Sequence, residues 1–237
     1  MVMVPRIIVS LAITALAAFA SASARATSNH EYGKDEYAII RDGLSPNKQM
    51  SLASHGEGEL GDENLRVWLM AEPAHSKIMA LPDISPDNNL DTAPDAYHAF
   101  WSKDARHVAV AFRSSRHEVT LNLYSLEGRR VRPISGPSLF KKVTSREVAD
   151  HDGVSQSISG IDWRGDNRFV LREFQTFVTS DPAFLRLLGA YGHVAEKRED
   201  GRLYVQFAAE ADCLLLPDYR TRVIDIRPAN PDHPPDW

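Results

Sequence analysis

Cysteine is almost absent from this chain of 237 residues, in which Cys213 is the only one. A single cysteine excludes an intrachain disulfide, so packing and hydrogen bonds must stabilise the fold. The segment Cys213–Leu216 is apolar, and we expect the thiol to be a small buried hydrophobic group. The alternative is a reactive thiol.

Several short motifs of enzymes are also missing. The chain has no G-x-S-x-G, H-E-x-x-H or C-x-x-C sequence, and its nine histidines lack the spacing of metal ligands. The S-x-x-K pattern of penicillin-recognising enzymes occurs at Ser45–Lys48 and Ser138–Lys141, but the S-D-N and K-T-G motifs are missing. No helix is predicted to carry either serine. These absences favour a protein without catalytic activity.

Long apolar runs are confined to the N-terminus. Ile7–Ala20 is apolar, follows the positive charge of Arg6 and precedes small residues, which is the pattern of a secretory signal peptide. The run is shorter than the roughly 20 residues that cross a membrane; the alternatives are an uncleaved anchor and a buried helix. We expect residues 1–26 to be removed by cleavage near Ala24 or Ala26. The mature chain would then lie in the periplasm or outside the cell, without stable membrane insertion.

An excess of positive charge is lacking as well. The chain has 27 Lys and Arg against 32 Asp and Glu, a formal net charge of −5. Phosphate binding needs a concentrated basic surface, so no nucleic-acid partner is expected. A protein or an envelope ligand fits the predicted location better.

The most informative feature that is present is a weak repeat. Each copy has an apolar or aromatic residue, a four-residue turn and an alternating strand. In the second copy, Val108, Val110 and Phe112 share one face while alanines occupy the other, which predicts a strand buried on both faces. Units of this length made of strands are typical of blades. The copies are Leu44–Ser54, Trp101–Ala111 and Trp163–Glu173.

The second copy, W-S-K-D-A-R-H-V-A-V followed by T-L-N-L-Y-S-L-E-G-R-R-V-R-P-I, resembles the repeat of WD-like β-propellers, including the Tol-type periplasmic ones. The resemblance covers residues 44–79, 98–134 and 160–175, and no copy has the complete Pro-Asp-Gly turn. It implies an all-β fold of antiparallel blades that serves as a binding platform. Two arrangements remain open: a closed small propeller and an open partial propeller.

One domain is expected over residues 27–228, with a single short helix near 182–188. Ser180 or Asp181 can cap that helix, Pro182 suits its first position and Gly189 can end it. Residues 229–237 are rich in proline and are expected to form a flexible tail.

An acidic stretch overlaps a glycine motif. Gly56–Gly61 matches the dinucleotide fingerprint G-x-G-x-x-G, but a strand follows it instead of a helix, so the match is interpreted as accidental. Oxygen ligands on a loop suit calcium, although the usual order of a calcium loop is missing. We therefore expect a solvated hairpin and no cofactor, and a calcium site is the alternative. The calcium candidates are Glu57, Glu59, Asp62 and Glu63.

Two hairpin loops are candidates for binding. If the repeats are arranged alike, both loops emerge on one face of the scaffold, where binding residues usually lie. The alternative is a pair of solvated turns. The candidates are His55, Glu57 and Glu59 in the first loop and Arg113, Arg116, His117 and Glu118 in the second.

Taken together, the patterns favour a secreted or periplasmic propeller-like protein that binds a ligand or partner without catalysis. The alternative is a secreted hydrolase with a site between blades, supported by calcium. His151 and Asp152 are an acid–base candidate for that alternative.

Overall fold

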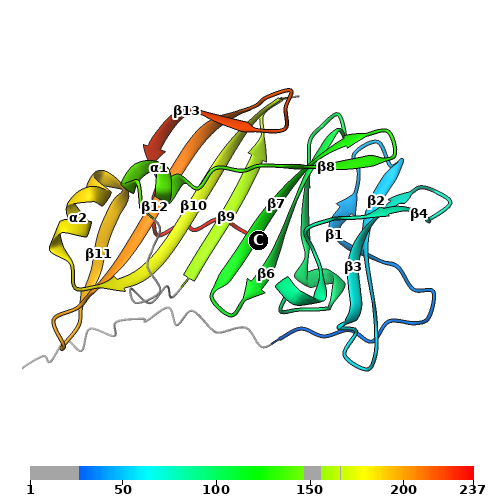
Figure 1. The fold of residues 1–237 in the computed structure, drawn as a ribbon, viewed down its shortest axis with the longest axis horizontal. Helices are drawn as coiled ribbons and strands as arrows, with labels where there is room; N and C mark the ends of the chain where they lie inside the picture. Colours follow the sequence, from blue (N-terminus) through cyan, green and yellow to red (C-terminus); the bar gives the residue numbers. More distant parts are fainter. Residues whose placement is uncertain (1–26, 147–155, 166) are drawn as a thin grey trace, which may run out of the picture.

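The computed structural model describes residues 27–146, 156–165 and 167–237, so the predicted leader and the pair His151 and Asp152 lie outside the described residues. Within these ranges, thirteen strands form one mixed sheet, accompanied by two short α-helices (Figure 1). The prediction of a β protein is confirmed. The sheet is open, with β4 at one edge and β11 and β13 at the other.

Two antiparallel meanders of four strands form one half of the molecule. The first strands of the two meanders, β1 and β5, lie side by side in parallel. The connection between the meanders contains the 3₁₀ turns η1 (Pro86–Asn88) and η2 (Pro94–Ala96). The first meander is β1 (Ala38–Leu44), β2 (Met50–Glu57), β3 (Glu63–Ala71) and β4 (Ser76–Ala80), and the second is β5 (His98–Trp101), β6 (His107–Ser115), β7 (Glu118–Glu127) and β8 (Arg130–Ile134).

The other half begins with α1 and continues the sheet from β7, which pairs with β9 in parallel. The long strand β12 pairs with β10 along one edge and shares its other edge between β11 and β13. The elements are α1 (Leu139–Thr144), β9 (Gln156–Trp163), β10 (Arg168–Thr179), α2 (Pro182–Leu188), η4 (Gly189–Tyr191), β11 (Gly192–Lys197), β12 (Leu203–Leu215) and β13 (Thr221–Pro228).

The helix expected near 182–188 is confirmed as α2. The Asp181 carboxylate accepts a hydrogen bond from the Ala183 N–H at 2.8 Å, and Pro182 stands at the first helical position. Gly189, with a φ of 53°, follows the last helical residue. The local signals in the sequence are therefore the ones that fix this helix.

The turn between the first and second strands has the same pattern of hydrogen bonds in both meanders. The N–H groups of Ser45 and Ser102 each donate to the carbonyl five residues later at 2.9 Å. Each serine Oγ also donates to an Asn or Asp oxygen two residues later. The fourth turn residues, Lys48 and Ala105, have φ values of 57° and 58°. The two turns thus have the same conformation, with a left-handed residue where the Pro-Asp-Gly turn has glycine.

The hydrophobic residues form three clusters. One lies between the two meanders, and β6 is buried on both faces as predicted, with Val108 and Ala109 both fully buried. A second cluster lies under α1 and α2, which cover one face of the sheet near β11 (Figure 1). Cys213 belongs to it; burial raises the pKa of its thiol to about 11, and the prediction of a buried cysteine is confirmed. The third is a strip on the opposite face, formed by Ala111, Val119, Ile158, Phe174 and Ala208.

Residues 229–237, for which the sequence predicts a flexible tail, lie across that strip. The Ala229 N–H donates to the Ala208 carbonyl at 3.1 Å, and Trp237 packs against the strip. A Cβ atom on Gly160 would lie 2.6 Å from the Cβ of Pro235, so the close approach of the tail needs glycine there. The tail covers this back face, and the opposite, front face carries the polar cavity described below.

Candidate functional site

The two predicted binding loops lie at the same ends of the strands. Since β1 and β5 run in parallel and both meanders are antiparallel, the β2–β3 and β6–β7 turns point the same way. Both lie at the lower edge in Figure 1. The residues predicted within them have different environments.

Arg113 is buried in an ion pair with Asp91. Its Nε and Nη2 atoms donate to the two Asp91 carboxylate oxygens at 2.6 and 2.5 Å, and both residues are less than a tenth exposed. The hydrogen bonds to Asp91 raise the pKa of Arg113 above its ordinary value. The Ser28 N–H donates to the same carboxylate at 2.7 Å. Arg113 therefore joins three parts of the chain that are distant in sequence.

In the first loop, His55 Nδ1 lies 2.6 Å from the Glu36 carbonyl oxygen, and its ring stacks on Tyr37. Glu57 accepts a hydrogen bond from Asn64 Nδ2 at 2.9 Å, while Glu59 is exposed. Among the residues that the structure describes, no three His, Cys, Asp or Glu side chains are grouped to hold a metal ion. In the second loop, Arg116 and His117 are exposed.

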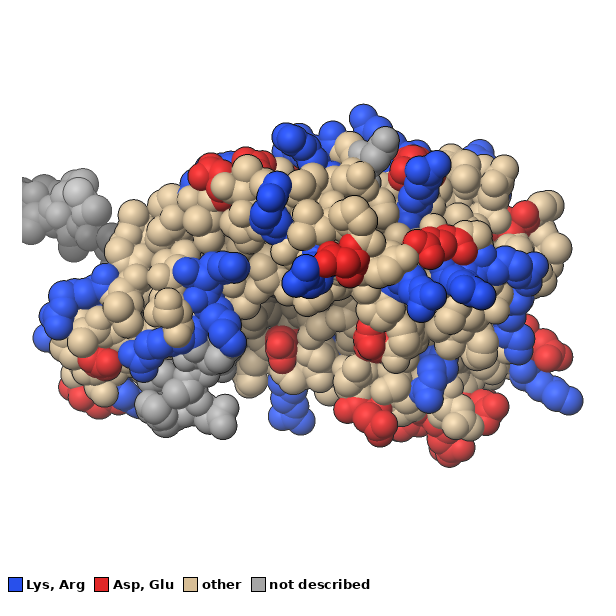
Figure 2. All heavy atoms as spheres, turned by 45° about the horizontal axis from the view of Figure 1, so that its top comes forward, with Lys and Arg blue, Asp and Glu red and all other residues tan. Residues whose placement is uncertain are grey.

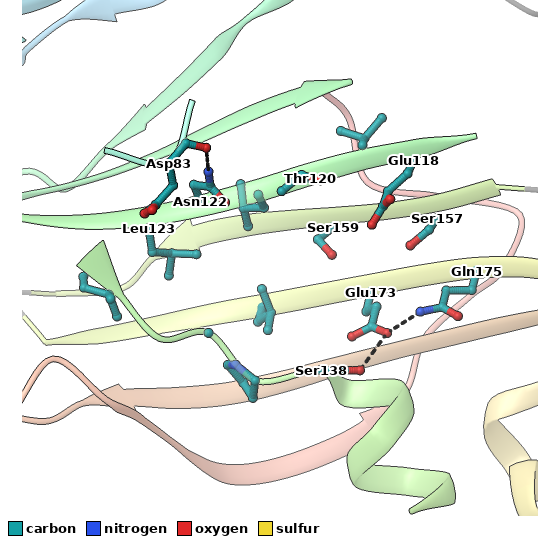
Figure 3. A pocket seen from close by; sticks show the side chains of 16 residues that line it. Asp83, Glu118, Thr120, Asn122, Leu123, Ser138, Ser157, Ser159, Glu173 and Gln175 are labelled. Carbon is teal, nitrogen blue, oxygen red and sulfur yellow. Dashed lines mark hydrogen bonds between the residues drawn. The ribbon is translucent and has the colours of Figure 1, made fainter. Parts of the chain in front are cut away.

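Glu118 is the one predicted residue that lines the main pocket, a cavity of about 420 Å³ on the front face. Its walls come from β7, β9, β10, the loop after β4 and residues 136–138 before α1 (Figure 3). This volume is in the range of sites for small ligands. The polar residues of the lining are Asp83, Glu118, Thr120, Asn122, Ser138, Ser157, Ser159, Glu173 and Gln175.

The pocket opens where the sheet splits. On the same edge, β7 pairs with β9 only at Glu118 and Val119, and with β8 from Leu123 onward. Residues 120–122 therefore have no strand beside them on this edge within the described chain. The chain leaves β8, crosses over the sheet towards α1 and forms the opposite wall (Figure 1). The divergence of β8 and β9 thus creates the cavity.

The floor of the pocket is polar because polar and apolar side chains alternate along two neighbouring strands, and the polar ones face the pocket. In β9, Ser157 and Ser159 face the pocket, whereas Ile158 lies in the apolar strip behind. In β10, Glu173 and Gln175 face the pocket in the same manner. The register places Ser159 opposite Glu173 and Ser157 opposite Gln175. These four residues were not predicted from the sequence, although polar and apolar residues alternate in Q-S-I-S-G-I and R-E-F-Q-T.

Glu173 is the most buried carboxylate of the pocket, at 5% exposure. Its oxygens accept hydrogen bonds from the N–H groups of Leu139 and Phe140 at 2.6 and 3.2 Å, and from Gln175 Nε2 at 2.8 Å. Burial raises the pKa of Glu173, and these hydrogen bonds oppose the rise. The side chain therefore fixes the start of α1 at the wall of the pocket.

Ser138, the serine of the second S-x-x-K pattern, is the N-cap residue directly before α1, a helix that was not predicted from the sequence. Its Oγ accepts the Lys141 backbone N–H at 3.1 Å, the usual role of a helix cap. A helix of six residues has too little apolar periodicity to be recognised in a sequence. Its start depends on Glu173, 34 residues from Leu139.

The charge of the lining is one-sided. Asp83, Glu118 and Glu173 supply carboxylates, and no Lys, Arg or His belongs to the described lining. Serine, threonine and amide side chains add neutral donors and acceptors. This environment favours ligands that donate hydrogen bonds or carry positive charge, and it disfavours phosphate and carboxylate groups.

The raised pKa of Glu173 predicts a specific dependence of stability on pH. The folded protein holds the Glu173 proton more tightly than the unfolded chain does. This contribution to the free energy of unfolding is fully present below the pKa of the unfolded chain, near 4.5, and is lost as the pH rises through the higher pKa of the folded state. We expect the free energy of unfolding of the wild type, relative to Glu173→Gln, to fall over that window. Urea denaturation of both proteins across a pH series measures the difference. A difference independent of pH would contradict the burial of an ionisable group here.

Comparisons of the chain with protein-family models, with curated proteins and with solved structures found no match. None of the helices in the described part of the chain combines the length and the apolar character that crossing a membrane requires.

Proposed function

We propose that this protein is a non-catalytic binding module of the periplasm or the extracellular space, and that its ligand occupies the pocket between β7, β9 and β10. The ligand is a small molecule with hydroxyl or amine groups. The observation that carries this proposal is the polar lining where the sheet splits, which has three carboxylates and no Lys, Arg or His among its described residues. The signal-peptide pattern of residues 1–26 supports the location.

The scaffold of this site is, in our proposal, an open partial propeller. Each meander has four antiparallel strands, and the first strands of the two meanders adjoin. The identical turns at Ser45 and Ser102 and the apolar cluster between the meanders support a repeated blade. Loops and faces of such scaffolds commonly bind ligands.

A hydrolase is the second candidate, and one observation favours it: Glu118 and Glu173 line the same pocket. Hydrolysis of a glycosidic bond uses two carboxylates, one as acid and one as base or nucleophile. Glu173, however, is already bonded to two backbone N–H groups and an amide, and Ser138 serves as a helix cap. These groups have structural partners, which supports binding over catalysis.

The test is the binding of named probes to the full chain, followed by thermal denaturation. The probes are glucose, N-acetylglucosamine, putrescine and spermidine, with phosphate and citrate as anionic counter-probes. We expect at least one of the first four to raise the melting temperature, since binding to the folded state alone stabilises it. Stabilisation by the anions alone would contradict the proposed ligand class.

A pair of variants locates the binding. Ser159→Val removes a hydroxyl from the pocket floor, and Ser76→Val makes the same change on exposed β4. Loss of one hydrogen bond should weaken affinity about tenfold in the pocket variant only. Equal affinities of both variants would place the ligand elsewhere. Hydrolysis by the wild type of the p-nitrophenyl glycosides of glucose or N-acetylglucosamine, which contain the glycosidic bond that the free sugars lack, would favour the hydrolase.

A further inference from the structure

Two hairpins that are distant in sequence bring their arginine residues together at the ends of the strands opposite the acidic β2–β3 loop. We call Arg129, Arg130, Arg132, Arg220 and Arg222 the arginine patch. The first three belong to the β7–β8 hairpin, and the other two belong to the β12–β13 turn and the start of β13. We propose that this patch docks an extended acidic segment of a partner protein.

The two hairpins are joined by specific contacts. Ser135, just after β8, forms a parallel bridge with Arg220, and its N–H donates to the Tyr219 carbonyl at 3.0 Å. Thr221 Oγ1 donates to the Ser135 carbonyl at 2.8 Å. The Tyr219 hydroxyl also donates to the carboxylate of Glu127, the residue that stands opposite Arg130 in the backbone register of β7 and β8. These contacts hold the two arginine-bearing hairpins side by side.

The local acids do not neutralise the patch. Asp218 is held by Arg220, with Nε and Nη2 of the arginine at 2.7 and 2.6 Å from Oδ2. Glu127 accepts the Tyr219 hydroxyl. The other four arginines form no ion pair with any described residue, and all five are exposed. Five positive charges against two negative ones make this a basic surface on a protein of net charge −5.

The guanidinium groups of the patch indicate that the partner presents carboxylates. All five residues are arginine, whose planar guanidinium binds carboxylates through two parallel hydrogen bonds. In contrast, acidic side chains gather at the lower right of Figure 2, where the β2–β3 loop lies. The separation of charge would orient an acidic partner toward the patch.

The neighbouring strand indicates an extended partner. β13 ends this side of the sheet and pairs along its length with β12 alone among the described strands. Arg222 and Ile224, the latter 55% exposed, both face solvent, whereas Val223 between them packs against the core; the register of β13 against β12 shifts just after Val223. An added strand with alternating acidic and apolar side chains fits this edge, since its backbone can pair with β13. A nucleic acid or a membrane would not use that alternation.

Fluorescence anisotropy of a labelled peptide of alternating glutamate and valine, titrated with the full chain, tests this proposal. A peptide of alternating lysine and valine is the counter-probe. We expect the acidic peptide to bind, and Arg130→Glu with Arg132→Glu to weaken the affinity at least about tenfold. Reversal of two exposed charges elsewhere, Arg186→Glu with Lys197→Glu, should leave the affinity within about twofold.

Three outcomes would overturn the proposal: unchanged affinity in the patch variant, equal binding of the lysine peptide, or binding of phosphatidylglycerol vesicles in place of the acidic peptide. The melting temperatures of both variants show that the folds are intact. None of the five arginines belongs to the lining of the pocket, so failure here leaves the proposed function untouched.

Discussion

Replacing Asp91 with alanine is expected to lower the free energy of unfolding by about 3–5 kcal/mol, because it leaves the buried Arg113 guanidinium without its counter-charge. The loss would also free the Ser28 N–H and weaken the attachment of the loop between the meanders. Urea denaturation near neutral pH measures the change. This effect would make Arg113 a residue of the fold even though it stands beside a predicted binding loop.

The matched control for that experiment is Asp95→Ala. Asp95 lies on the same loop but is exposed, and such a change is usually within about 0.5 kcal/mol of neutral. If Asp91→Ala were as mild as its control, the pair would not be buried in solution. Arg113 would then be available to a ligand.

Phe140→Ala is expected to cost about 3–5 kcal/mol, since it removes a buried ring from the cluster under the helices. The ring packs edge-on against Phe177, Phe184 and Phe207, with centroid distances of 5.9, 5.9 and 5.0 Å. A helix of six residues has little stability of its own, so α1 depends on this packing. Denaturation of the variant, compared with Lys142→Ala on the exposed side of α1, measures the loss.

The same substitution should affect the pocket. The N–H groups of Leu139 and Phe140 hold the Glu173 carboxylate, so a loosened α1 would release it and widen the wall. We expect weaker binding of the pocket ligand at temperatures where the variant is still folded. Unchanged affinity would mean that α1 does not shape the site.

Local patterns were sufficient for much of the fold. The alternation in β6 predicted burial on both faces, and the residues around Pro182 predicted α2 with its cap. The turns at Ser45 and Ser102 were recognised because Ser, Asn and Asp bond their own backbone there. In each case the interactions that decide the structure lie within a few residues of each other.

Distant contacts account for what the sequence did not reveal. α1 was missed because six residues carry little periodicity, and because its first two N–H groups bond to Glu173 on another element. The burial of Arg113 depends on Asp91, which lies in a loop 22 residues earlier. Neither contact leaves a periodic pattern, so neither could be predicted from spacing alone.

The pocket, too, could be predicted from the sequence only in part. The alternation of polar and apolar residues around Ser157 and Ser159 indicates a strand with one polar face. It does not indicate that β9 lies beside β7. Parallel pairing of two strands separated by α1 is a feature of topology, which a single sequence does not specify. Among the predicted loop residues, only Glu118 therefore came to line the site.

The central claim is that a polar ligand occupies the pocket between β7, β9 and β10. The most direct measurement is a crystal structure of the full chain soaked with the sugar or amine that raises its melting temperature most. The account predicts that the bound molecule contacts Ser159, Gln175 and Glu118 within hydrogen-bond distance. A ligand bound at another surface, with the pocket filled only by water, would contradict it.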